Sequence, residues 1–334
     1  MPAPHQLKTS LRFRGLKQEA WVVITLVFVV VLIEFALRSQ TSNLSGNIQH
    51  IGQIPAIASR LAQQSNSMLF LGNSLTNNGI ETSIFQARQS GLNAAIVEKI
   101  TPDATSLSDW YCVFKNNVAE LDTPPRVVVL GFAWLQLSDQ YPINASRLGG
   151  YFCSIADVAS LSGTGLTNHN KLLDFLAGAG SHVYLSREAI RNRLLDALVP
   201  NYRSVAQEMN VNPGLRTKEK IEKIEYNYTT LVRFSQMARD ADVNLVLVAM
   251  PVKDEYPIDP GLMETVKNHG ITLLDMRHTP GLTSSMYLDQ IHLNASGRRH
   301  FSLALAHALP DVLRRIDVKT GTHGLASTTA NRAH

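Results

Sequence analysis

The chain has 334 residues, a formal net charge of +4, and 45% hydrophobic and 17% charged residues. A chain of this length can bury a substantial core as one large domain or two small ones. Its basic residues are scattered along the sequence rather than gathered into the concentrated patch that nucleic-acid recognition requires, so we expect no nucleic-acid partner.

The first element in chain order is an apolar segment over residues 20–37, in which Glu34 is the one charged residue. A helix of about 20 residues crosses the hydrocarbon core of a bilayer, so this segment is just long enough. Four Lys or Arg residues precede it, whereas the first basic residue after Arg38 is Arg60. Because basic flanks stay in the cytoplasm, we predict a cytoplasmic N-terminus over residues 1–19 and an extracytoplasmic, periplasmic domain beyond the anchor.

A cleaved signal peptide is the main alternative for this segment. Signal peptides have a shorter apolar run, about 7–15 residues, followed by a small-x-small cleavage site. Glu34, Leu37 and Arg38 stand where that site would be, so the sequence favours an uncleaved signal anchor in the cytoplasmic (inner) membrane. A buried core helix is a third interpretation, and the basic flank argues against it.

After the anchor, residues 38–65 are rich in Ser, Gln, Asn and Gly and are expected to form a tether that leads into a short helix. Beyond it, apolar runs typical of strands alternate with helical patterns. We expect strands at 68–72, 94–100, 126–131, 243–250 and 271–275, and helices at 81–88, 107–118, 218–240 and 296–316. Strands that are apolar along their whole length indicate a parallel sheet covered by helices on both faces.

These elements predict one α/β domain over residues 66–316, interrupted by a long insertion at about 138–217. The insertion contains an apolar stretch at 171–176 and a helical pattern at 186–198. The tail, residues 317–334, is polar and rich in small residues, and we expect it to be disordered.

The two cysteines, Cys112 and Cys153, lie far apart in the sequence, and neither belongs to a pattern with metal-ligand spacing. In an oxidising compartment they could form a disulfide, and otherwise they are two buried thiols. The sequence leaves both alternatives open. It indicates no metal site and no dissociable cofactor.

Two short motifs carry candidate catalytic residues. GNSLT (72–76) follows the first expected strand, and DQIHLN (289–294) precedes the last expected helix. A serine hydroxyl becomes a nucleophile when a neighbouring base removes its proton, and His292 could be that base for Ser74. Asp289, in the same loop, could orient the imidazole. A lone serine here would more often cap a helix, and a lone histidine would be a solvated loop residue, but the combination favours a triad.

This combination resembles the SGNH (GDSL-like) hydrolase superfamily, whose first block is G-D/N-S-x-[ST] and whose last block is D-x-x-H. The resemblance extends from Met68 to about Leu309. It implies a flavodoxin-like three-layer αβα sandwich with a central parallel sheet, and a catalytic triad of Ser74, His292 and Asp289.

The middle blocks of the family, which complete the oxyanion hole, depart from the pattern. Asp103 stands where the family has a glycine, and Ala133 stands where it has an asparagine. Asp103 could contact substrate or cap the helix that begins near Leu107, and the cap is favoured. The candidate oxyanion or substrate-binding residues are Asn73, Asp103, Ala104 and Ala133. The Ser74 N–H remains as a donor, and the loss of a side-chain donor typically costs about 10²–10³ in rate.

An anchored SGNH-like domain with altered oxyanion blocks is similar in layout to bacterial cell-envelope proteins that act in alginate O-acetylation and in D-alanine transfer to teichoic acid. This resemblance implies a serine O-acyltransferase that modifies an envelope or exported polysaccharide beside a multi-pass membrane acyltransferase. Two alternatives stay open: a carbohydrate acetylesterase with the same triad, and a non-catalytic envelope scaffold.

Overall fold

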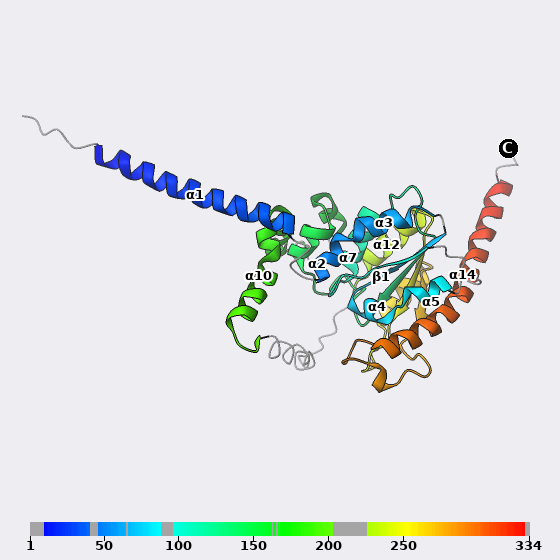
Figure 1. Cartoon of the computed structure of the whole chain (residues 1–334). Coiled ribbons are helices and arrows are strands. Elements are labelled where there is room, and N and C mark those ends of the chain that lie inside the picture. Colours follow the sequence, from blue (N-terminus) through cyan, green and yellow to red (C-terminus); the bar gives the residue numbers. More distant parts are fainter. Residues whose placement is uncertain are drawn as a thin grey trace, which may run out of the picture.

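The computed structural model places a helix-covered sheet beyond a long N-terminal helix (Figure 1). The described residues are 10–40, 46–64, 66–87, 96–161, 163, 164, 166, 168–202 and 226–330. Within them, 10–18, 39–40 and 315–330 are described by their backbone alone.

Five parallel strands form the central sheet in the order β2-β1-β3-β4-β5. Their bounds are β1 Ser67–Leu71, β2 Ile96–Ile100, β3 Val127–Phe132, β4 Asn244–Ala249 and β5 Thr272–Asp275. This is the strand order of the flavodoxin-like sheet, whose order reverses between β1 and β3. The structure confirms the five predicted strands. It also confirms the predicted α/β class, because every residue of β1 and β3 is buried between helix layers.

Helices cover both faces of the sheet (Figure 1). One face carries α3 (Ile54–Leu61), α7 (Leu107–Asn117), α12 (Thr229–Asp240) and α13 (Pro260–Asn268). The other face carries α5 (Thr82–Ala87) and α14 (Ala295–Ala330). Aromatic side chains pack on each face of the sheet. The rings of Phe114 on α7 and Phe234 on α12 lie 4.9 Å apart, and those of Phe70 on β1 and Phe85 on α5 lie 4.6 Å apart. The three-layer sandwich is therefore packed on both sides of the strands.

Much of the segment expected to be a tether, residues 38–65, is helical. Helix α2 (Gly46–Gly52) follows α1 (Ser10–Gln40) after residues 41–45, and α3 follows α2 directly. The side chains of Ile51, Ile54, Ile57 and Leu61 are buried in the core. Most of segment 38–65 thus belongs to the domain, because its isoleucines recur at helical spacing and pack against the sheet layer.

Two other boundaries differ from expectation. Of the helix predicted over 218–240, the structure contains α12 from Thr229, and residues 203–225 lie outside the described part of the chain. The expected disordered tail at 317–334 is wrong through Ala330, because the backbone of α14 continues as helix to that residue. Residues 311–330 contain no proline, so each of them has the backbone N–H that a continuing helix needs.

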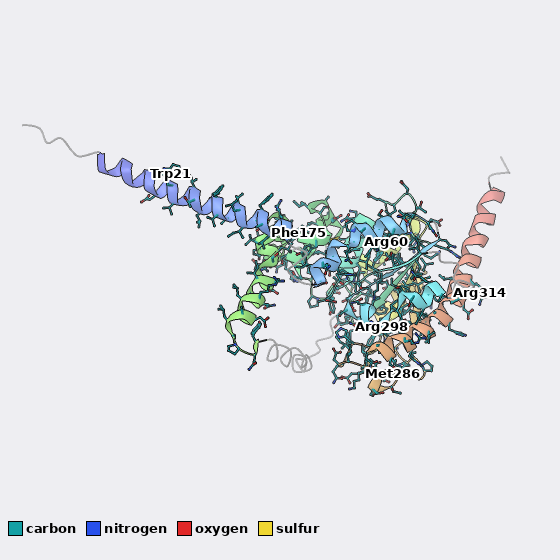
Figure 2. The ribbon with its side chains drawn as sticks, viewed as in Figure 1. Trp21, Arg60, Phe175, Met286, Arg298 and Arg314 are labelled. Carbon is teal, nitrogen blue, oxygen red and sulfur yellow. A yellow bond between two sulfur atoms is a disulfide. The ribbon has the colours of Figure 1, made fainter. Side chains whose placement is uncertain are left out.

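Helix α1 extends away from the sandwich (Figure 1), and Figure 2 shows its side chains, including that of Trp21, projecting from a helix without neighbours along most of its length. The segment Glu19–Arg38 is long and apolar enough to cross a membrane, and it is unburied within the protein. A core helix of a soluble protein would be largely buried, whereas a membrane span or a signal sequence would not. The structure therefore removes the core-helix interpretation.

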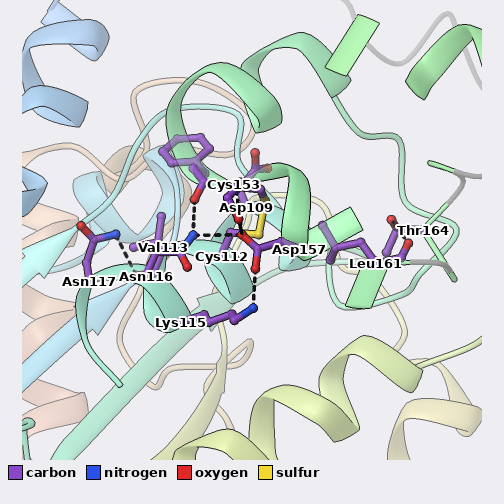
Figure 3. The surroundings of a disulfide bond; sticks show 12 residues. Asp109, Cys112, Val113, Lys115, Asn116, Asn117, Cys153, Asp157, Leu161 and Thr164 are labelled. Atoms are coloured by element: carbon purple, nitrogen blue, oxygen red, sulfur yellow. Dashed lines mark hydrogen bonds and ion pairs between the residues drawn. A yellow bond between two sulfur atoms is a disulfide. The ribbon is translucent and has the colours of Figure 1, made fainter. Parts of the chain in front are cut away.

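A disulfide between Cys112 and Cys153 joins α7 to the start of the insertion (Figure 3). The insertion continues through α8 (Ala145–Arg147), η2 (Leu148–Phe152), η3 (Ile155–Leu161), α9 (His169–Gly180) and α10 (His182–Leu198). Around the bridge, the Asp157 carboxylate pairs with Lys115 and accepts hydrogen bonds from Asn116 and Ser154. The disulfide alternative left open by the sequence is thus the one that the fold adopts.

Removing this bridge should destabilise the domain without unfolding the sheet. The two cysteines are 41 residues apart, and a closed loop of that length contributes about 4 kcal/mol in the chain-entropy estimate. We expect the double variant Cys112→Ser/Cys153→Ser to lose roughly 2–4 kcal/mol of unfolding free energy in urea titrations. Reductant should lower the stability of the wild type by a similar amount and leave the double variant unchanged. Equal stabilities of the two proteins would contradict the prediction.

Candidate active site

Ser74 lies at the carboxyl end of β1, where the chain turns into the short helix α4 (Ser74–Gly79). The side chain of Asn73 caps this helix by accepting the N–H of Leu75 at 3.0 Å. Gly72 allows the tight turn, because a Cβ at this position would lie 2.0 Å from Oγ1 of Thr76. The turn presents the Ser74 hydroxyl beyond the sheet edge, beside the point where the strand order reverses.

His292 and Asp289 lie in one tight loop before α14. Tyr287 and Leu293 form an antiparallel bridge across its base, and the N–H of Leu288 donates to the carbonyl of His292 at 2.8 Å. Inside the loop, Oδ1 of Asp289 accepts the N–H groups of Ile291 and His292, each at 2.8 Å. The Asp289 carboxylate therefore shapes the loop with one oxygen and keeps the other free for the imidazole.

The three predicted triad residues meet in one hydrogen-bonded chain. Nε2 of His292 lies 2.9 Å from Oγ of Ser74, and Nδ1 of His292 lies 2.8 Å from Oδ2 of Asp289. Burial alone would raise the pKa of Asp289, but hydrogen bonds from the His292 ring and from the N–H groups of Ile291 and His292 outweigh it and hold the pKa below 3.8. An ionised carboxylate on Nδ1 leaves Nε2 as the proton acceptor for the serine.

A second loop, residues 101–106 after β2, lies against the nucleophile turn. Oγ1 of Thr105 donates to the carbonyl of Gly72 at 3.1 Å, and Nδ2 of Asn73 donates to the carbonyl of Thr105 at 3.0 Å. The indole N–H of Trp110 also reaches the Gly72 carbonyl, at 2.9 Å. These buried bonds hold the two loops together at the sheet edge.

Within this second loop, Ala104 has a φ of 55°, the left-handed region that favours glycine. For a residue with a Cβ, this conformation costs about 1–2 kcal/mol. It stands beside the position at which the SGNH pattern has its glycine. The backbone N–H groups of Ser74 and Ala104 have no acceptor among the described residues.

Arg147, from the insertion, fixes the conformation of this loop. Its guanidinium donates to the carbonyl of Asp103 at 3.1 Å and to the carbonyl of Ala104 at 2.7 Å. It also contacts the buried carboxylate of Asp109 at 3.2 Å. Burial raises the pKa of Asp109, and the positive charge of Arg147 opposes that rise. No sequence motif points to Arg147, because its partners lie more than 35 residues earlier in the chain.

The other candidate residues have roles that differ from those expected. Asn73 is buried, and both ends of its side chain are used to cap α4 and to hold the 101–106 loop. Asp103 does not cap α7, because Ser106 and Asp109 form the capping box there. Ala133 is fully buried, and its N–H donates to Oε1 of Gln136 at 3.0 Å. The N–H of Ala133 is therefore not available to substrate.

A small apolar cluster adjoins the triad. Leu75, the residue after the nucleophile, packs with Ala133, Val252 and Tyr256, and half-buried Trp134 and Ile291 complete the cluster. The rings of Trp134 and Tyr256 lie 5.4 Å apart, and the Tyr256 hydroxyl donates to the carbonyl of Met250 at 2.9 Å. Because Leu75 directly follows Ser74 and Ile291 directly precedes His292, this cluster places apolar side chains beside the triad.

The strand order, the nucleophile turn after β1 and the Asp-His loop before the last helix occur together in one domain. The fold is the flavodoxin-like three-layer sandwich that the resemblance to the SGNH superfamily implies. Throughout the described ranges, no three His, Cys, Asp or Glu side chains come close enough together to hold a metal ion.

Comparisons with known proteins are distant. No protein-family profile matches the sequence, and no curated protein matches it either. Among solved structures, a protein from Bacteroides fragilis assigned as an acylhydrolase is 11% identical, with a TM-score of 0.37 and coverage of 76% of this chain and 96% of its own. Two variants of an acetylxylan esterase from Geobacillus stearothermophilus are 12% identical, with TM-scores of 0.37 and 0.36 and coverage of 72% and 93%. The activity of this chain has to be argued from its own site.

Proposed function

We propose that this chain is a membrane-anchored serine O-acyltransferase that forms an acyl-enzyme at Ser74 and acts outside the cytoplasm. The observation that carries the proposal is the continuous hydrogen-bonded chain from Ser74 through His292 to Asp289. A nucleophile, a base and an orienting carboxylate within hydrogen-bond reach form the arrangement that acyl transfer through serine requires. A scaffold that had lost catalysis would have no need to keep all three groups aligned.

In the proposed reaction, Nε2 of His292 takes the hydroxyl proton as Oγ of Ser74 attacks the acyl carbonyl of the donor. The resulting imidazolium is stabilised by Asp289 and gives its proton to the leaving group, which departs as an alcohol and leaves an acyl ester on Ser74. His292 then removes the proton from an incoming hydroxyl, which attacks this ester. The bond between the acyl carbon and Oγ of Ser74 breaks, and the serine takes the proton back from His292. The product is an acylated sugar when the hydroxyl belongs to a glycan, and a free acid when it belongs to water.

The N–H groups of Ser74 and Ala104 are the proposed donors to the negative oxygen of the tetrahedral intermediate. The family asparagine is replaced by Ala133, and the one N–H of that residue is occupied by Gln136. With two donors rather than three, we expect slow hydrolysis of ordinary esters. The apolar cluster of Leu75, Ala133, Trp134, Val252, Tyr256 and Ile291 supports a small acyl group, such as acetyl, as the transferred unit.

The proposed location rests on three features. Helix α1 presents an unburied apolar segment of membrane-spanning length, basic residues lie before it, and the domain contains a disulfide. Disulfides persist in oxidising compartments such as the bacterial periplasm, so the disulfide supports a domain outside the cytoplasm. We propose an envelope or exported polysaccharide as acceptor and a multi-pass membrane acyltransferase as the acyl source, on the similarity of layout to anchored envelope proteins.

The proposal is tested by treating the full-length protein, in detergent micelles, with a fluorophosphonate probe and with an activated acetyl ester. Peptide mapping of the modified protein should place both adducts on Ser74, and the Ser74→Ala variant should form neither. Thr76→Ser is a matched control, because it removes a methyl group in the same turn and leaves the proposed nucleophile in place.

Transfer and hydrolysis are then separated by adding acetylatable oligosaccharides to the acetylated protein. Acetylated sugar in excess of free acetate supports the transferase, whereas free acetate alone makes the chain an acetylesterase. A folded, monodisperse sample that forms no adduct at Ser74 would refute the acyl-enzyme.

A further inference from the structure

Large exposed apolar side chains are concentrated in the insertion. Outside α1, the described part of the chain exposes Ile155, Leu173, Leu176, Leu194, Leu198, Val199, Met263 and Leu288. Six of these eight residues lie between positions 155 and 199, and five of them lie in or directly after α9 and α10. Exposed apolar residues that gather in one segment, rather than scattering singly, mark a surface that binds something.

The distal half of α10 is especially exposed. From Arg191 to Leu198, every side chain except that of Leu195 is exposed. Leu194 and Leu198 are one turn apart, and Arg191 lies one turn before Leu194, so these three share a side of the helix. A helix with this little packing of its own gains most of its stability from a surface that covers it. Exposed leucines and arginines are the residue types of helices that lie in a membrane interface, where a long arginine side chain extends to the headgroups while leucines meet the acyl chains.

The N-terminus of α10 is attached to the end of the anchor. The Glu34 carboxylate accepts the N–H of His182 at 2.6 Å, the N–H of Val183 at 3.0 Å and the Ser181 hydroxyl at 3.1 Å. Glu34 lies one turn before Arg38, the last residue of the apolar segment. These contacts satisfy the Glu34 carboxylate. They also hold the start of α10 beside the C-terminal end of α1, where the proposed anchor leaves the bilayer.

Figure 1 shows α10 leaving the C-terminal end of α1 and running across the axis of α1 rather than along it. A spanning helix is tilted on average only about 20° from the bilayer normal. An element that crosses such a helix at the edge of its apolar segment therefore runs along the membrane surface. Its exposed leucines would meet the boundary between headgroups and acyl chains.

We propose that the distal half of α10, with the exposed leucines of α9, lies in the interface of the same bilayer that α1 spans. The proposal rests on the anchoring part of the proposed function and is independent of the acyl chemistry. The occupant of this surface is lipid: its arginines meet headgroup phosphates and its leucines meet the upper acyl chains.

The same arrangement brings the catalytic edge of the sheet to the membrane. Five residues, 41–45, separate α1 from α2, so the two helices are at most about 20 Å apart. Helix α2 contacts the 101–106 loop directly: Oδ1 of Asn47 accepts the N–H of Asp103 at 2.9 Å, and Nε2 of His50 accepts the N–H of Thr101 at 3.0 Å. We therefore infer that the substrates of this site are presented at the membrane surface.

The experiment uses the full-length protein in phosphatidylcholine–phosphatidylglycerol vesicles, with a polarity-sensitive fluorophore on a single introduced cysteine. The labelled variants are Leu194→Cys and Leu198→Cys, with Met263→Cys on α13 as an exposed control in the domain and Phe28→Cys as a control in the anchor. We expect lipids with a shallow spin label to quench positions 194 and 198 strongly, lipids with a spin label deep in the acyl chain to quench position 28, and neither lipid to quench position 263.

Quenching at 28 but not at 194 or 198 would overturn the proposal while leaving the anchor intact. It would indicate that a protein partner, rather than lipid, binds the exposed leucines of α9 and α10. Absence of quenching at 28 would overturn it by removing the anchor. Ser74 labelling by fluorophosphonate in the same vesicles reports separately on the chemistry.

A second variant tests the consequence for substrate presentation. The Leu194→Glu/Leu198→Glu protein should keep the wild-type rate toward a soluble acetyl ester and lose about tenfold in rate toward an acetyl ester displayed on a lipid in the vesicle. Met263→Glu, which alters an exposed apolar residue on α13 outside the insertion, is the matched control. Equal rates of the double variant and the wild type on the lipid-displayed ester would refute the role of α10.

Discussion

Replacing His292 with Ala should reduce acylation of Ser74 by about 10⁴-fold or more, since the serine would lose the base that activates it. The ring of His292 bridges Ser74 and Asp289 at 2.9 and 2.8 Å, and no other described side chain is hydrogen-bonded to the Ser74 hydroxyl. The measurement is the rate of fluorophosphonate labelling and of acetyl-ester turnover by the variant. Labelling at the wild-type rate would mean that Ser74 is activated by another group or is not the nucleophile.

Asp289→Asn separates the electrostatic role of the carboxylate from its role in shaping the loop. An amide keeps an oxygen that can accept the N–H groups of Ile291 and His292, but it lacks the charge that stabilises the imidazolium. We expect a fall in kcat of about 10³–10⁴, with a loss of stability limited to the charge interaction between the carboxylate and the His292 ring. Asp289→Ala should show a similar fall in kcat together with a lower unfolding free energy, because it also leaves those two N–H groups without their acceptor.

The pH dependence of the wild type follows from the same carboxylate. Because the folded pKa of Asp289 lies below 3.8, the stability that it contributes is present above the unfolded value and is lost only as the pH falls through the lower folded value. We expect the wild type to be more stable than Asp289→Asn at pH 6, and this difference to shrink as the pH is lowered below about 4. Thermal unfolding of both proteins between pH 3 and pH 7 measures the difference.

The strands and the triad were predictable because each depends on a short stretch of sequence. The five strands are continuous apolar runs, and a parallel sheet brings their carboxyl ends to one edge. Ser74 belongs to a turn directly after β1, and Asp289 and His292 lie within one loop that needs no distant partner to close. The fold topology then brings the two loops together across 218 residues of sequence separation.

The start of α7 and the helix α3 both have a local sequence signal. Ser106 and Asp109 have the spacing of a capping box, which marks the start of α7 more clearly than Asp103 does. The apolar spacing of Ile54, Ile57 and Leu61 similarly indicates an amphipathic helix inside the polar segment taken as a tether.

The remaining features depend on contacts that no local pattern encodes. Arg147 reaches carbonyl groups 43 and 44 residues earlier in the chain, and backbone carbonyls leave no trace in a sequence. The pairing of Cys112 with Cys153 requires the insertion to fold back onto α7, which brings their Cα atoms to 5.2 Å. The attachment of Glu34 to the N-terminus of α10 likewise joins segments about 150 residues apart.

Replacing Arg147 with Lys should slow acylation by up to about 10²-fold while leaving the KM for a small acetyl ester nearly unchanged. Lysine keeps a positive charge opposite the buried Asp109, but its single ammonium cannot reproduce the planar contact with the carbonyls of Asp103 and Ala104. The left-handed conformation of Ala104 would then relax, and its N–H would leave the position where the oxyanion develops. Loss of one such donor costs about 10²–10³ in rate.

The split between kcat and KM distinguishes positioning of the loop from a general loss of structure. Arg147→Ala is a poorer test, because it leaves the Asp109 carboxylate buried without its counter-charge, at a cost of about 3–5 kcal/mol. Arg233→Ala is the matched control, since Arg233 is an exposed arginine that donates to the carbonyl of Ser160 away from the site. If Arg147→Lys and Arg233→Ala have the same kcat as the wild type, the insertion does not position the oxyanion loop. If Arg147→Lys alone is slow, the insertion positions the 101–106 loop through the Arg147 guanidinium.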